Sequence, residues 1–429
     1  METILIKNGK ILGENGIFEK DILIKNGNIF AIENNIPENI DYKVIDAKNK
    51  LVIPGAIDPH VHLDLPTNAG NSSDNFYTGS VAAFFGGTTT IIDFVTPEKG
   101  ESLINALHKR KGIANDVLCD YSLHMGITYW HSSLEKEIKQ CIENEGITSF
   151  KAYLAYKGTI GIDYDELFEL MKVISKYNGT LLVHCEDGDK VLMNQQKLIS
   201  EGKTMPKYHS MSRLPEVEAI AVEKVIKMAE ITNCNVYLVH ISSAEAMKII
   251  LEYNLPNVLV ETCPQYLILN DELYQNDNFA KTAKYIISPP LRKKEDNEVL
   301  WSYLSENKID VVSTDHCPFN IFGQKDYGID DFTKIPNGAG GIEHRLELLY
   351  EFGVLKERIS LQQWINLCSS NPSDIFGLKN KGKILKGYDA DLVVWNSDLS
   401  NVISVSNQHQ RCDNNIYEGI KISGQAETV

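Results

Sequence analysis

The chain of 429 residues has no excess of positive charge: it contains 42 Lys and Arg and 58 Asp and Glu, which gives a formal charge of −16. It has no run of basic residues. We therefore expect neither nucleic acid nor an anionic membrane surface as a partner. No apolar stretch reaches membrane-spanning length, and residues 1–9 lack the charged-then-apolar pattern of a signal peptide.

Closely spaced cysteine pairs are also missing. The eight cysteines are scattered and form no CxxC motif, which is typical of free thiols in a reducing compartment. We expect a cytoplasmic protein, and with 43% hydrophobic residues the chain is long enough to bury a sizeable core.

Short β-branched runs and helix-favouring stretches alternate through the middle of the chain. The eight runs are residues 50–58, 89–95, 117–123, 147–154, 180–184, 235–240, 257–263 and 310–315. Amphipathic stretches lie between them, at 101–115, 134–144, 164–176, 216–232 and 243–253. This α/β pattern predicts a (β/α)8 TIM-like barrel. A doubly wound open sheet would need a glycine-rich phosphate turn after the first strand, and none is present.

The two ends of the chain have a different pattern. The sequence ILIKNG occurs at residues 4–9 and again at 22–27, and Asn-Gly between β-branched runs predicts hairpin turns in a small antiparallel sheet. Residues 383–396 return to the same strand-rich style. We therefore expect a smaller β-sandwich domain built from residues 1–53 and 380–429, with the barrel at 54–379.

Chemically useful side chains lie where these predicted strands end. In an extended strand, His60 and His62 would point the same way, and the carboxyl ends of barrel strands converge on one cavity. Each residue alone has an ordinary structural explanation, such as a buried histidine bonded to a carbonyl or an aspartate that caps a helix. Their joint placement favours a single site. The candidates are His60, His62, Lys151, His184, His240 and Asp315.

The donors of this set are four imidazoles and one carboxylate, with no thiolate. Such nitrogen and oxygen ligands suit Zn²⁺, or otherwise Mn²⁺, Co²⁺ or Ni²⁺. Four or five ligands exceed what one open catalytic ion needs and suit two divalent ions per subunit. A two-metal site needs a bridging anion, which a protonated Lys151 cannot supply.

At these residues the chain resembles the hydantoinase/dihydropyrimidinase family of the amidohydrolase superfamily, the cyclic amidohydrolases. The matching stretches are 54–63 (PGAIDPHVHL), 86–89 (GGTT), 149–151 (SFK), 155–158 (AYKG), 183–186 (VHCE), 239–242 (VHIS), 287–292 (ISPPLR), 313–319 (STDHCPF) and 335–338 (IPNG). The resemblance runs from the first strand to about residue 420.

The resemblance implies a binuclear metal centre. One ion would be held by His60, His62, Lys151 and Asp315, and the other by Lys151, His184 and His240. It implies that Lys151 has reacted with CO₂ to give N6-carboxylysine, whose carbamate oxygens bridge the ions. A hydroxide formed between the two ions would then attack the ring amide.

The resemblance also assigns roles to other residues. Asp315 would take the proton of the attacking water and return it to the leaving nitrogen, and Tyr156 would donate to the developing oxyanion. Ser288 and Asn337 would hold the ring imide through backbone groups. The odd spacing of Tyr156 from Lys151 places Tyr156 in a loop rather than in the strand. His124 and His316 are expected to be structural.

The residue after Leu63 indicates the substrate class. A dihydroorotase would carry an arginine at position 64 to pair a substrate carboxylate, and an allantoinase commonly has asparagine, whereas this chain has Asp64. An anion there disfavours an anionic substrate and favours a neutral cyclic diamide, a hydantoin or a 5,6-dihydropyrimidine, opened to an N-carbamoyl amino acid. In the loop of residues 63–78, Leu65, Pro66, Phe76 and Tyr77 could line an apolar pocket for a ring substituent.

Two alternatives remain beside this interpretation: another cyclic amidohydrolase, and a non-catalytic dihydropyrimidinase-like scaffold protein. Scaffold relatives lose metal ligands, and all six candidates are kept here. The resemblance implies a homotetramer. Because relatives usually continue beyond the stretch matching residues 413–419 with a tail that helps subunits pack, a homodimer is the other expectation.

Overall fold

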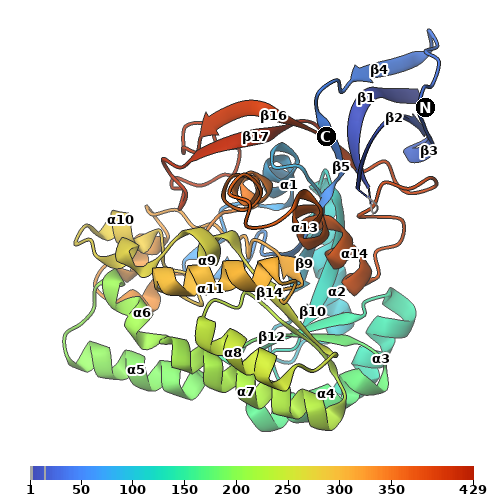
Figure 1. Ribbon diagram of the computed structural model, residues 1–429. Helices are drawn as coiled ribbons and strands as arrows, with labels where there is room; N and C mark the ends of the chain where they lie inside the picture. The colour runs from blue at the N-terminus through green and yellow to red at the C-terminus, as the bar shows by residue number, and fades with distance from the viewer. Residues whose placement is uncertain (1–2, 14–15) are drawn as a thin grey trace.

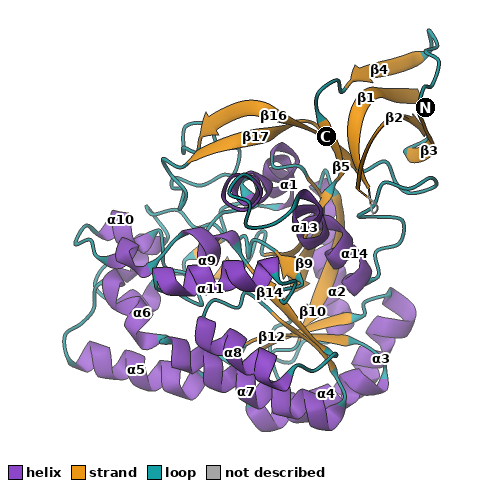
Figure 2. Cartoon of the chain, viewed as in Figure 1, coloured by secondary structure: helices purple, strands orange, loops and turns teal. Residues whose placement is uncertain are grey.

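The computed structural model describes residues 3–13 and 16–429, and its larger part is a ring of parallel strands surrounded by helices (Figures 1 and 2). The eight strands follow one another in chain order, each paired with the next. They are β6 (Ala56–Val61), β9 (Thr88–Val95), β10 (Asp120–Gly126), β11 (Ser149–Tyr153), β12 (Thr180–His184), β13 (Asn235–Leu238), β14 (Val258–Thr262) and β15 (Val311–Val312). A parallel bridge between Val61 and His316 brings the last unit back to the first, which confirms the predicted barrel.

Helices cover the outside of this barrel. Those in the predicted stretches are α2 (Leu103–Ile113), α3 (Leu134–Glu145), α4 (Tyr164–Lys176), α7 (Pro215–Thr232) and α8 (Ala244–Tyr253). The others are α1 (Phe76–Phe85), α5 (Gly188–Ser200), α6 (His209–Ser212), α9 (Pro264–Ile268), α10 (Phe279–Ala283), α11 (Lys294–Ser305), α12 (Arg345–Leu349), α13 (Leu361–Ile365) and α14 (Asn371–Phe376). A two-stranded ribbon of β7 (Pro66–Thr67) and β8 (Gly70–Asn71) lies in the loop after β6.

Helix α4 illustrates why the helix boundaries were readable. Asp163 and Glu166 form a reciprocal capping box at its start, which satisfies backbone N–H groups that have no partner inside the helix. Its buried residues, Leu167, Leu170 and Ile174 among them, recur at the spacing of one helical face. The helix spans the predicted residues, 164–176.

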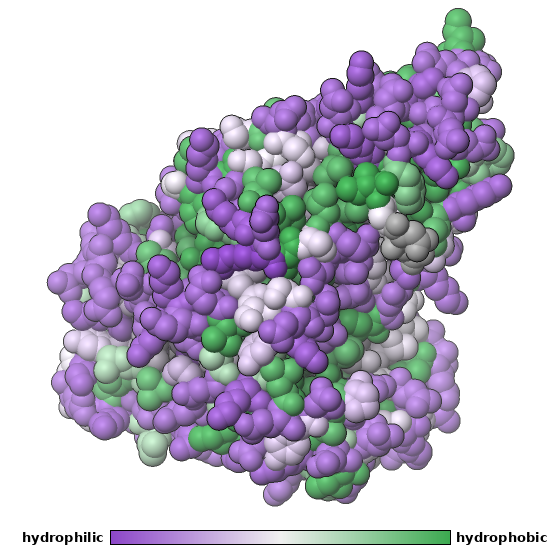
Figure 3. Space-filling model, in the orientation of Figure 1, coloured by the Kyte–Doolittle hydropathy of each residue, from purple (hydrophilic) through white to green (hydrophobic). Residues whose placement is uncertain are grey.

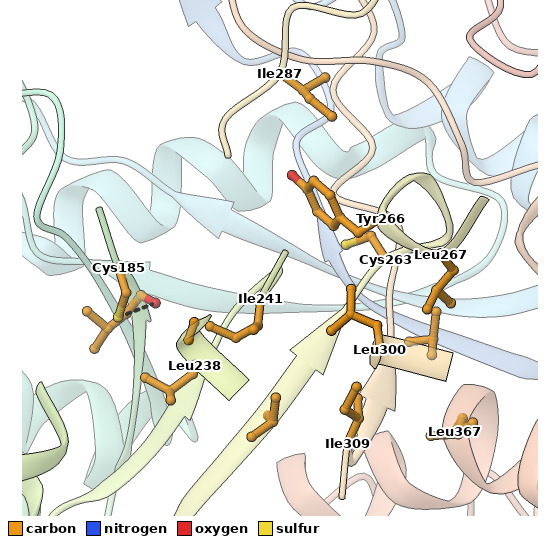
Figure 4. Close-up of a cluster of buried hydrophobic side chains, with 14 of the residues drawn as sticks. Cys185, Leu238, Ile241, Cys263, Tyr266, Leu267, Ile287, Leu300, Ile309 and Leu367 are labelled. Carbon is orange, nitrogen blue, oxygen red and sulfur yellow. Dashed lines mark hydrogen bonds between the residues drawn. The ribbon is translucent and has the colours of Figure 1, made fainter. Parts of the chain in front are cut away.

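The main hydrophobic core lies between the strands and these helices. Leu238, Leu300 and Ile309 are among its fully buried members (Figure 4). Strands buried on both faces read as continuous apolar runs, which is the pattern seen in the sequence.

Both ends of the chain join one seven-stranded sheet beside the barrel, in the upper part of Figure 1. Its strands are β1 (Thr3–Gly13), β2 (Gly16–Lys25), β3 (Asn28–Glu33), β4 (Tyr42–Asp46), β5 (Leu51–Pro54), β16 (Leu392–Val402) and β17 (Lys421–Thr428). Opposite faces of the sheet bury separate apolar clusters, one around Ile6 and Ile22 and the other around Leu5 and Leu23. The prediction that both chain ends build one β-structure together is therefore confirmed, and its division from the barrel as a domain stays a proposal.

Two details of this domain differ from the sequence prediction. The prediction of an antiparallel sheet in the first fifty residues is confirmed for β1, β2 and β3 but was wrong for β4, which pairs with β1 in parallel, as β5 also does. Asn26 and Gly27 form the expected turn with positive φ, but Asn8 lies in a bulge within β1. There the backbone N–H of Asn8 donates to the Asp21 carboxylate over 3.0 Å, so the strand continues instead of turning.

The first predicted run, residues 50–58, is divided between the two units. Leu392 in β16 pairs with Pro54 at the end of β5, whereas Ala56 begins the barrel and pairs with Thr88. Gly55 lies between them, where a Cβ atom would come within 2.1 Å of the Thr89 hydroxyl. Because Pro54 pairs within the sheet of the chain ends, we propose that this boundary lies at Gly55, just after the predicted 53/54; the predicted boundary at 379/380 stays a proposal.

The β-domain and the barrel nevertheless share hydrophobic core. Trp395 of β16 packs edge-on against Trp364 of α13, with ring centroids 5.0 Å apart, and both side chains are fully buried. Residues 403–420, between β16 and β17, lie against barrel loops: Asp413 accepts from the backbone N–H groups of Ile321 and Phe322. The visible face of the molecule is mainly hydrophilic (Figure 3). No helix in the described ranges is long and apolar enough to span a bilayer.

Candidate metal centre

The six candidate ligands come from five strands and meet at the carboxyl end of the barrel. The best-defined group contains His60 and His62, at the end of β6, and Asp315, beyond β15. The Nε2 atoms of both histidines lie 3.2 Å from the same Asp315 oxygen. The prediction that His60 and His62 direct their imidazoles at one point is confirmed.

His184 and His240 form the other side of the site. The Nδ1 atom of His184 lies 3.1 Å from the Nε2 atom of His240. The ring of His240 lies between the rings of His184 and His60, with centroid distances of 4.7 and 5.4 Å. Burial lowers the pKa of all three imidazoles, so that each stays neutral near pH 7, the form that binds metal ions.

Lys151 lies in β11, and its side chain is fully buried. Its Nζ atom is 5.2 Å from the ring centroids of Phe94 and Tyr153, and no described residue hydrogen-bonds to it. Burial lowers the pKa of Lys151 to about 8, although Glu261 and Asp315 act in the opposite direction. An appreciable fraction of this amine is therefore unprotonated and nucleophilic near neutral pH.

The donor atoms fit a divalent metal ion. Donor atoms of His60, His240 and Asp315 lie within 4.8 Å of one another. The Nδ1 atoms of His62 and His240 are buried without a hydrogen-bond partner among the described residues. Such orphaned polar atoms are costly unless something else binds in the site. Nitrogen and oxygen donors without thiolate are the ligands that zinc and its neighbours accept.

The strands end earlier than the sequence suggested. Strand β13 stops at Leu238 and β15 at Val312, whereas the predicted runs continued to His240 and Asp315. Beyond those ends, His240 and Asp315 have φ angles of 42° and 53°, in the left-handed region that non-glycine residues rarely adopt. Backbone strain of this kind costs about 1–3 kcal/mol per residue and is typical of functional sites.

Tyr156 is in a loop, as its spacing predicted, because β11 ends at Tyr153 and Tyr156 has a φ of 62°. Its ring centroid lies 5.4 Å from that of His184. Burial raises the pKa of Tyr156, while nearby Arg213 and Ser288 act in the opposite direction. The phenol therefore remains protonated at neutral pH and is able to donate a hydrogen bond.

The two predicted substrate-binding residues belong to adjoining backbone segments. The backbone N–H of Gly338, next to Asn337, donates to the carbonyl of Ile286 over 3.0 Å. Ser288 is buried and Asn337 is half-buried. The structure therefore brings their segments together.

Sequence reasoning missed the carboxylates that orient the histidines. Glu261, at the end of β14, accepts from His60 Nδ1 over 2.7 Å and from the His240 backbone N–H over 3.0 Å. Glu186 lies 2.8 Å from His184 Nε2 and forms an ion pair with Arg213. Two signals were available in the sequence. Glu261 is an acid inside an apolar run, and Glu186 comes two residues after His184, at the end of a predicted strand.

The remaining predictions about this region have mixed outcomes. His124 is structural, because its two ring nitrogens bond to Ser149 and to the carbonyl of Pro59. Phe76 does not line a substrate pocket: it is buried in a separate apolar cluster, and the guanidinium of Arg110 lies over its ring. Phe76 is the first residue of α1 and lies on the buried side of that helix.

Comparison with known proteins identifies the family and the fold of this chain. A match to the Amidohydrolase family covers residues 51–425. The chain belongs to the amidohydrolase family. Over 431 residues it is 40% identical to the D-hydantoinase of Geobacillus stearothermophilus, covering all of this chain and 91% of the relative. It is 38% identical to the dihydropyrimidinase of Dictyostelium discoideum, of which it covers 86%.

Solved structures agree with this assignment to the hydantoinase and dihydropyrimidinase group of the amidohydrolases. The crystal structure of a dihydropyrimidinase from Brevibacillus agri superposes with a TM-score of 0.96 at 38% identity, over 99% of this chain and 92% of that one. An L-hydantoinase from Arthrobacter aurescens superposes with a TM-score of 0.88 at 26% identity. The amidohydrolase family is metal-dependent, and the donor atoms of His60, His240 and Asp315 form a possible metal site in this chain.

Proposed function

We propose that this amidohydrolase opens neutral cyclic diamides, hydantoins or 5,6-dihydropyrimidines, by hydrolysis to N-carbamoyl amino acids. One observation carries the proposal: four imidazoles and a carboxylate converge near a buried lysine that has no hydrogen-bond partner among the described residues, in a chain that matches hydantoinases along its whole length. Asp64, just beyond that site, supports a neutral rather than an anionic ring.

Two divalent ions, Zn²⁺ first among them, would be held by the six ligands, with Lys151 carboxylated by CO₂ to N6-carboxylysine. The lowered pKa of Lys151 supports this modification, because only the neutral amine adds to CO₂. Carboxylation would also replace a buried, unpaired cation with an anion among neutral histidines. When bound, such ions polarise a carbonyl and make water acidic enough to attack near neutral pH.

The side chains around this centre have separate roles in the proposal. Burial would raise the pKa of Asp315, but His60 and His62 outweigh it and lower the pKa. Asp315 is therefore ionised at neutral pH, accepts a proton from the attacking water and returns it to the ring nitrogen as the C–N bond breaks. Tyr156 donates its phenolic proton to the oxyanion.

Ser288 and Asn337 would bind the ring through backbone N–H and carbonyl groups. Their segments adjoin, so both can contact one small ring at the same time. A ring amide has a donor and acceptors in one plane, which matches recognition by backbone groups of both kinds.

The alternatives are less well supported. A dihydroorotase or an allantoinase would differ at position 64, and a non-catalytic scaffold would not be expected to keep six ligand-type side chains in contact. The eight cysteines are free thiols, which supports the cytoplasm as the location. A homotetramer, or a homodimer, stays a prediction that light scattering tests.

The central experiment combines substrate turnover with metal analysis. The zinc-loaded protein is expected to hydrolyse dihydrouracil, hydantoin and phenylhydantoin, to lose activity on chelation and to regain it with Zn²⁺ or Mn²⁺. Lys151→Ala should lose both activity and metal, and added acetate should restore part of the activity by supplying the missing carboxylate. Turnover by Lys151→Ala without acetate would overturn the metal model.

A matched control uses a lysine outside the site. Lys172 lies on the exposed face of α4 and pairs with Glu169. Lys172→Ala should keep full activity and metal content, so that any loss in Lys151→Ala is assigned to the site. Tyr156→Phe should keep its metal and lose about 10²–10³-fold in kcat, the usual effect of removing one oxyanion donor.

A further inference from the structure

A second buried lysine, Lys325, lies outside the metal centre. It is 0% exposed, in a short 3-10 turn, Lys325–Gly328, of the loop after β15. No carboxylate of the described residues pairs with it, and burial lowers its pKa to about 7. A fully buried lysine without an acidic partner costs stability, so its retention calls for a specific role.

The amine of Lys325 connects two backbone segments. Its Nζ atom donates to the carbonyl of Ile286 and to that of Pro336, each over 3.0 Å. Ile286 lies two residues before Ser288, and Pro336 lies immediately before Asn337. Lys325 therefore contacts both segments that carry the proposed substrate-binding backbone groups.

Further contacts hold the first of these segments, at Ile287 and Pro289. The Nε2 atom of His209 donates to the carbonyl of Ile287 over 2.8 Å, and the hydroxyl of Tyr266 donates to the carbonyl of Pro289 over 2.7 Å. The backbone of Lys325 is itself held by a bond from its N–H to the Asn320 carbonyl. The only other direct bond described between the segments runs from Gly338 to Ile286.

We propose that Lys325 is a positioning residue that sets the spacing between segments 286–288 and 336–338, so that both reach the substrate ring together. This inference rests on the proposed function, because it assumes that Ser288 and Asn337 bind the ring. An amine that donates to two carbonyls fixes their separation more rigidly than the single Gly338 bond does. The charge of Lys325 is not required, since a neutral amine still has two N–H donors.

The test separates ring binding from chemistry. Lys325→Met keeps the length and apolar stem of the side chain but removes both donors, whereas Lys325→Gln keeps an N–H₂ group on a shorter stem. With dihydrouracil and hydantoin we expect Lys325→Met to raise KM by about tenfold or more, the effect of losing about one net hydrogen bond. Its kcat should fall less than its KM rises, and its metal content should equal that of the wild type. Lys325→Gln should give an intermediate KM.

A control variant, Asn257→Ala, also loses two side-chain bonds to backbone carbonyls, but at the opposite end of the barrel. The side-chain amide of Asn257, next to β14, donates to the carbonyls of Cys234 and Ala229 over 2.7 and 3.5 Å. Asn257→Ala should lower thermal stability while leaving KM unchanged. A KM increase of the same size in that variant would reduce Lys325 to a general stabilising residue.

The outcomes distinguish this inference from the function beneath it. If the metal-loaded wild type opens neither ring, the proposed function fails first. If the wild type is active and both Lys325 variants keep a normal KM, or lose metal in parallel with activity, the positioning role alone is wrong. If Lys325→Met does not fold, the KM of Lys325→Gln decides.

Discussion

At the scale of single residues, the sequence identified the candidate ligands that the structure brings together, but not the carboxylates that orient them. The rule that strand ends of a barrel converge was enough for His60, His184 and Asp315. It could not find Glu261, because an acid inside an apolar run becomes informative only when a histidine from another strand is known to lie 2.7 Å away. The left-handed backbone conformation of His240 and Asp315 could not be predicted either, because most histidines and aspartates have negative φ angles.

Glu261 is expected to control metal affinity through His60. Glu261→Gln keeps the shape of the side chain but replaces a carboxylate that accepts from the imidazole with a weaker amide. Loss of such an orienting carboxylate typically weakens metal binding by about 10–100-fold. Competition with a chelator of known affinity measures the change. Tyr237→Phe, which removes only the 2.9 Å bond from the phenol to Glu261, should have a much smaller effect. Equal metal affinity in Glu261→Gln and the wild type would contradict the role.

Lys325 gives a pH dependence of stability whose sign is determined by its pKa. Burial lowers that pKa from 10.5 to about 7 in the folded state, so between these values the unfolded chain binds a proton that the folded chain does not. The contribution of Lys325 to the free energy of unfolding therefore rises as the pH increases from about 7 to 10.5. The thiols of Cys317 and Cys412, which face Lys325, have raised pKa values and stay neutral over most of it.

Urea unfolding of metal-free wild type and Lys325→Met at pH 7 and pH 9 measures this effect. The difference in unfolding free energy, wild type minus variant, should increase from pH 7 to pH 9 by up to about 2–3 kcal/mol. Titrating groups common to both proteins cancel in that difference. A difference that stays constant or shrinks as the pH rises would show that Lys325 keeps an ordinary pKa in the folded state.

At the scale of elements, periodicity and caps carried most of the prediction. The alternation of apolar runs with amphipathic stretches identified all eight barrel strands, and α4 matches its predicted residues. The failures have local physical causes. The bulge at Asn8 depends on Asp21, a partner on the neighbouring strand, and the end of β5 at Pro54 depends on pairing with β16, more than 330 residues later. Pairing between distant strands is not written in local sequence.

Lys381 is expected to stabilise the junction of the β-domain and the barrel. Its amine forms ion pairs with Asp120 at the start of β10 and with Asp389 and Asp391 before β16. Burial alone would lower the pKa of Lys381, but the hydrogen bonds to Asp120 and Asp391 outweigh it and raise the pKa. Lys381→Met would leave three carboxylates facing one another and should cost about 2 kcal/mol of unfolding free energy.

Salt provides the check on that assignment. If repulsion among the three carboxylates causes the loss, the gap between Lys381→Met and the wild type should narrow as NaCl is raised, because exposed charges are screened. Lys172→Met, which removes one exposed pair on α4, should change stability by less than about 0.5 kcal/mol. A salt-independent loss would point to side-chain packing instead.

At the scale of the whole molecule, we expect the two units to unfold as one cooperative body. The sequence predicted that both chain ends share a domain, but not that Trp395 of that domain packs on Trp364 of the barrel or that residues 403–420 lie against the barrel loops. The Trp395–Trp364 contact buries aromatic surface at the junction between the β-domain and the barrel. Buried apolar surface of this kind couples the unfolding of adjacent units.

Metal removal should therefore destabilise the whole protein in a single step. A metal ion that binds only the folded state adds RT ln(1 + [L]/Kd) to the free energy of unfolding, about 2.7 kcal/mol at a hundredfold excess over Kd. The residues proposed to hold the ions lie in, or just after, five strands of the barrel. Calorimetry of zinc-loaded and chelated protein is expected to show one transition in each case, with Tm lower by several degrees after chelation. Trp395→Ala should break this coupling, because it removes the aromatic contact between β16 and α13: chelation should then shift only the barrel transition and leave a separate transition of the β-domain in place. Two transitions in the chelated wild type would show that the shared core does not couple the units.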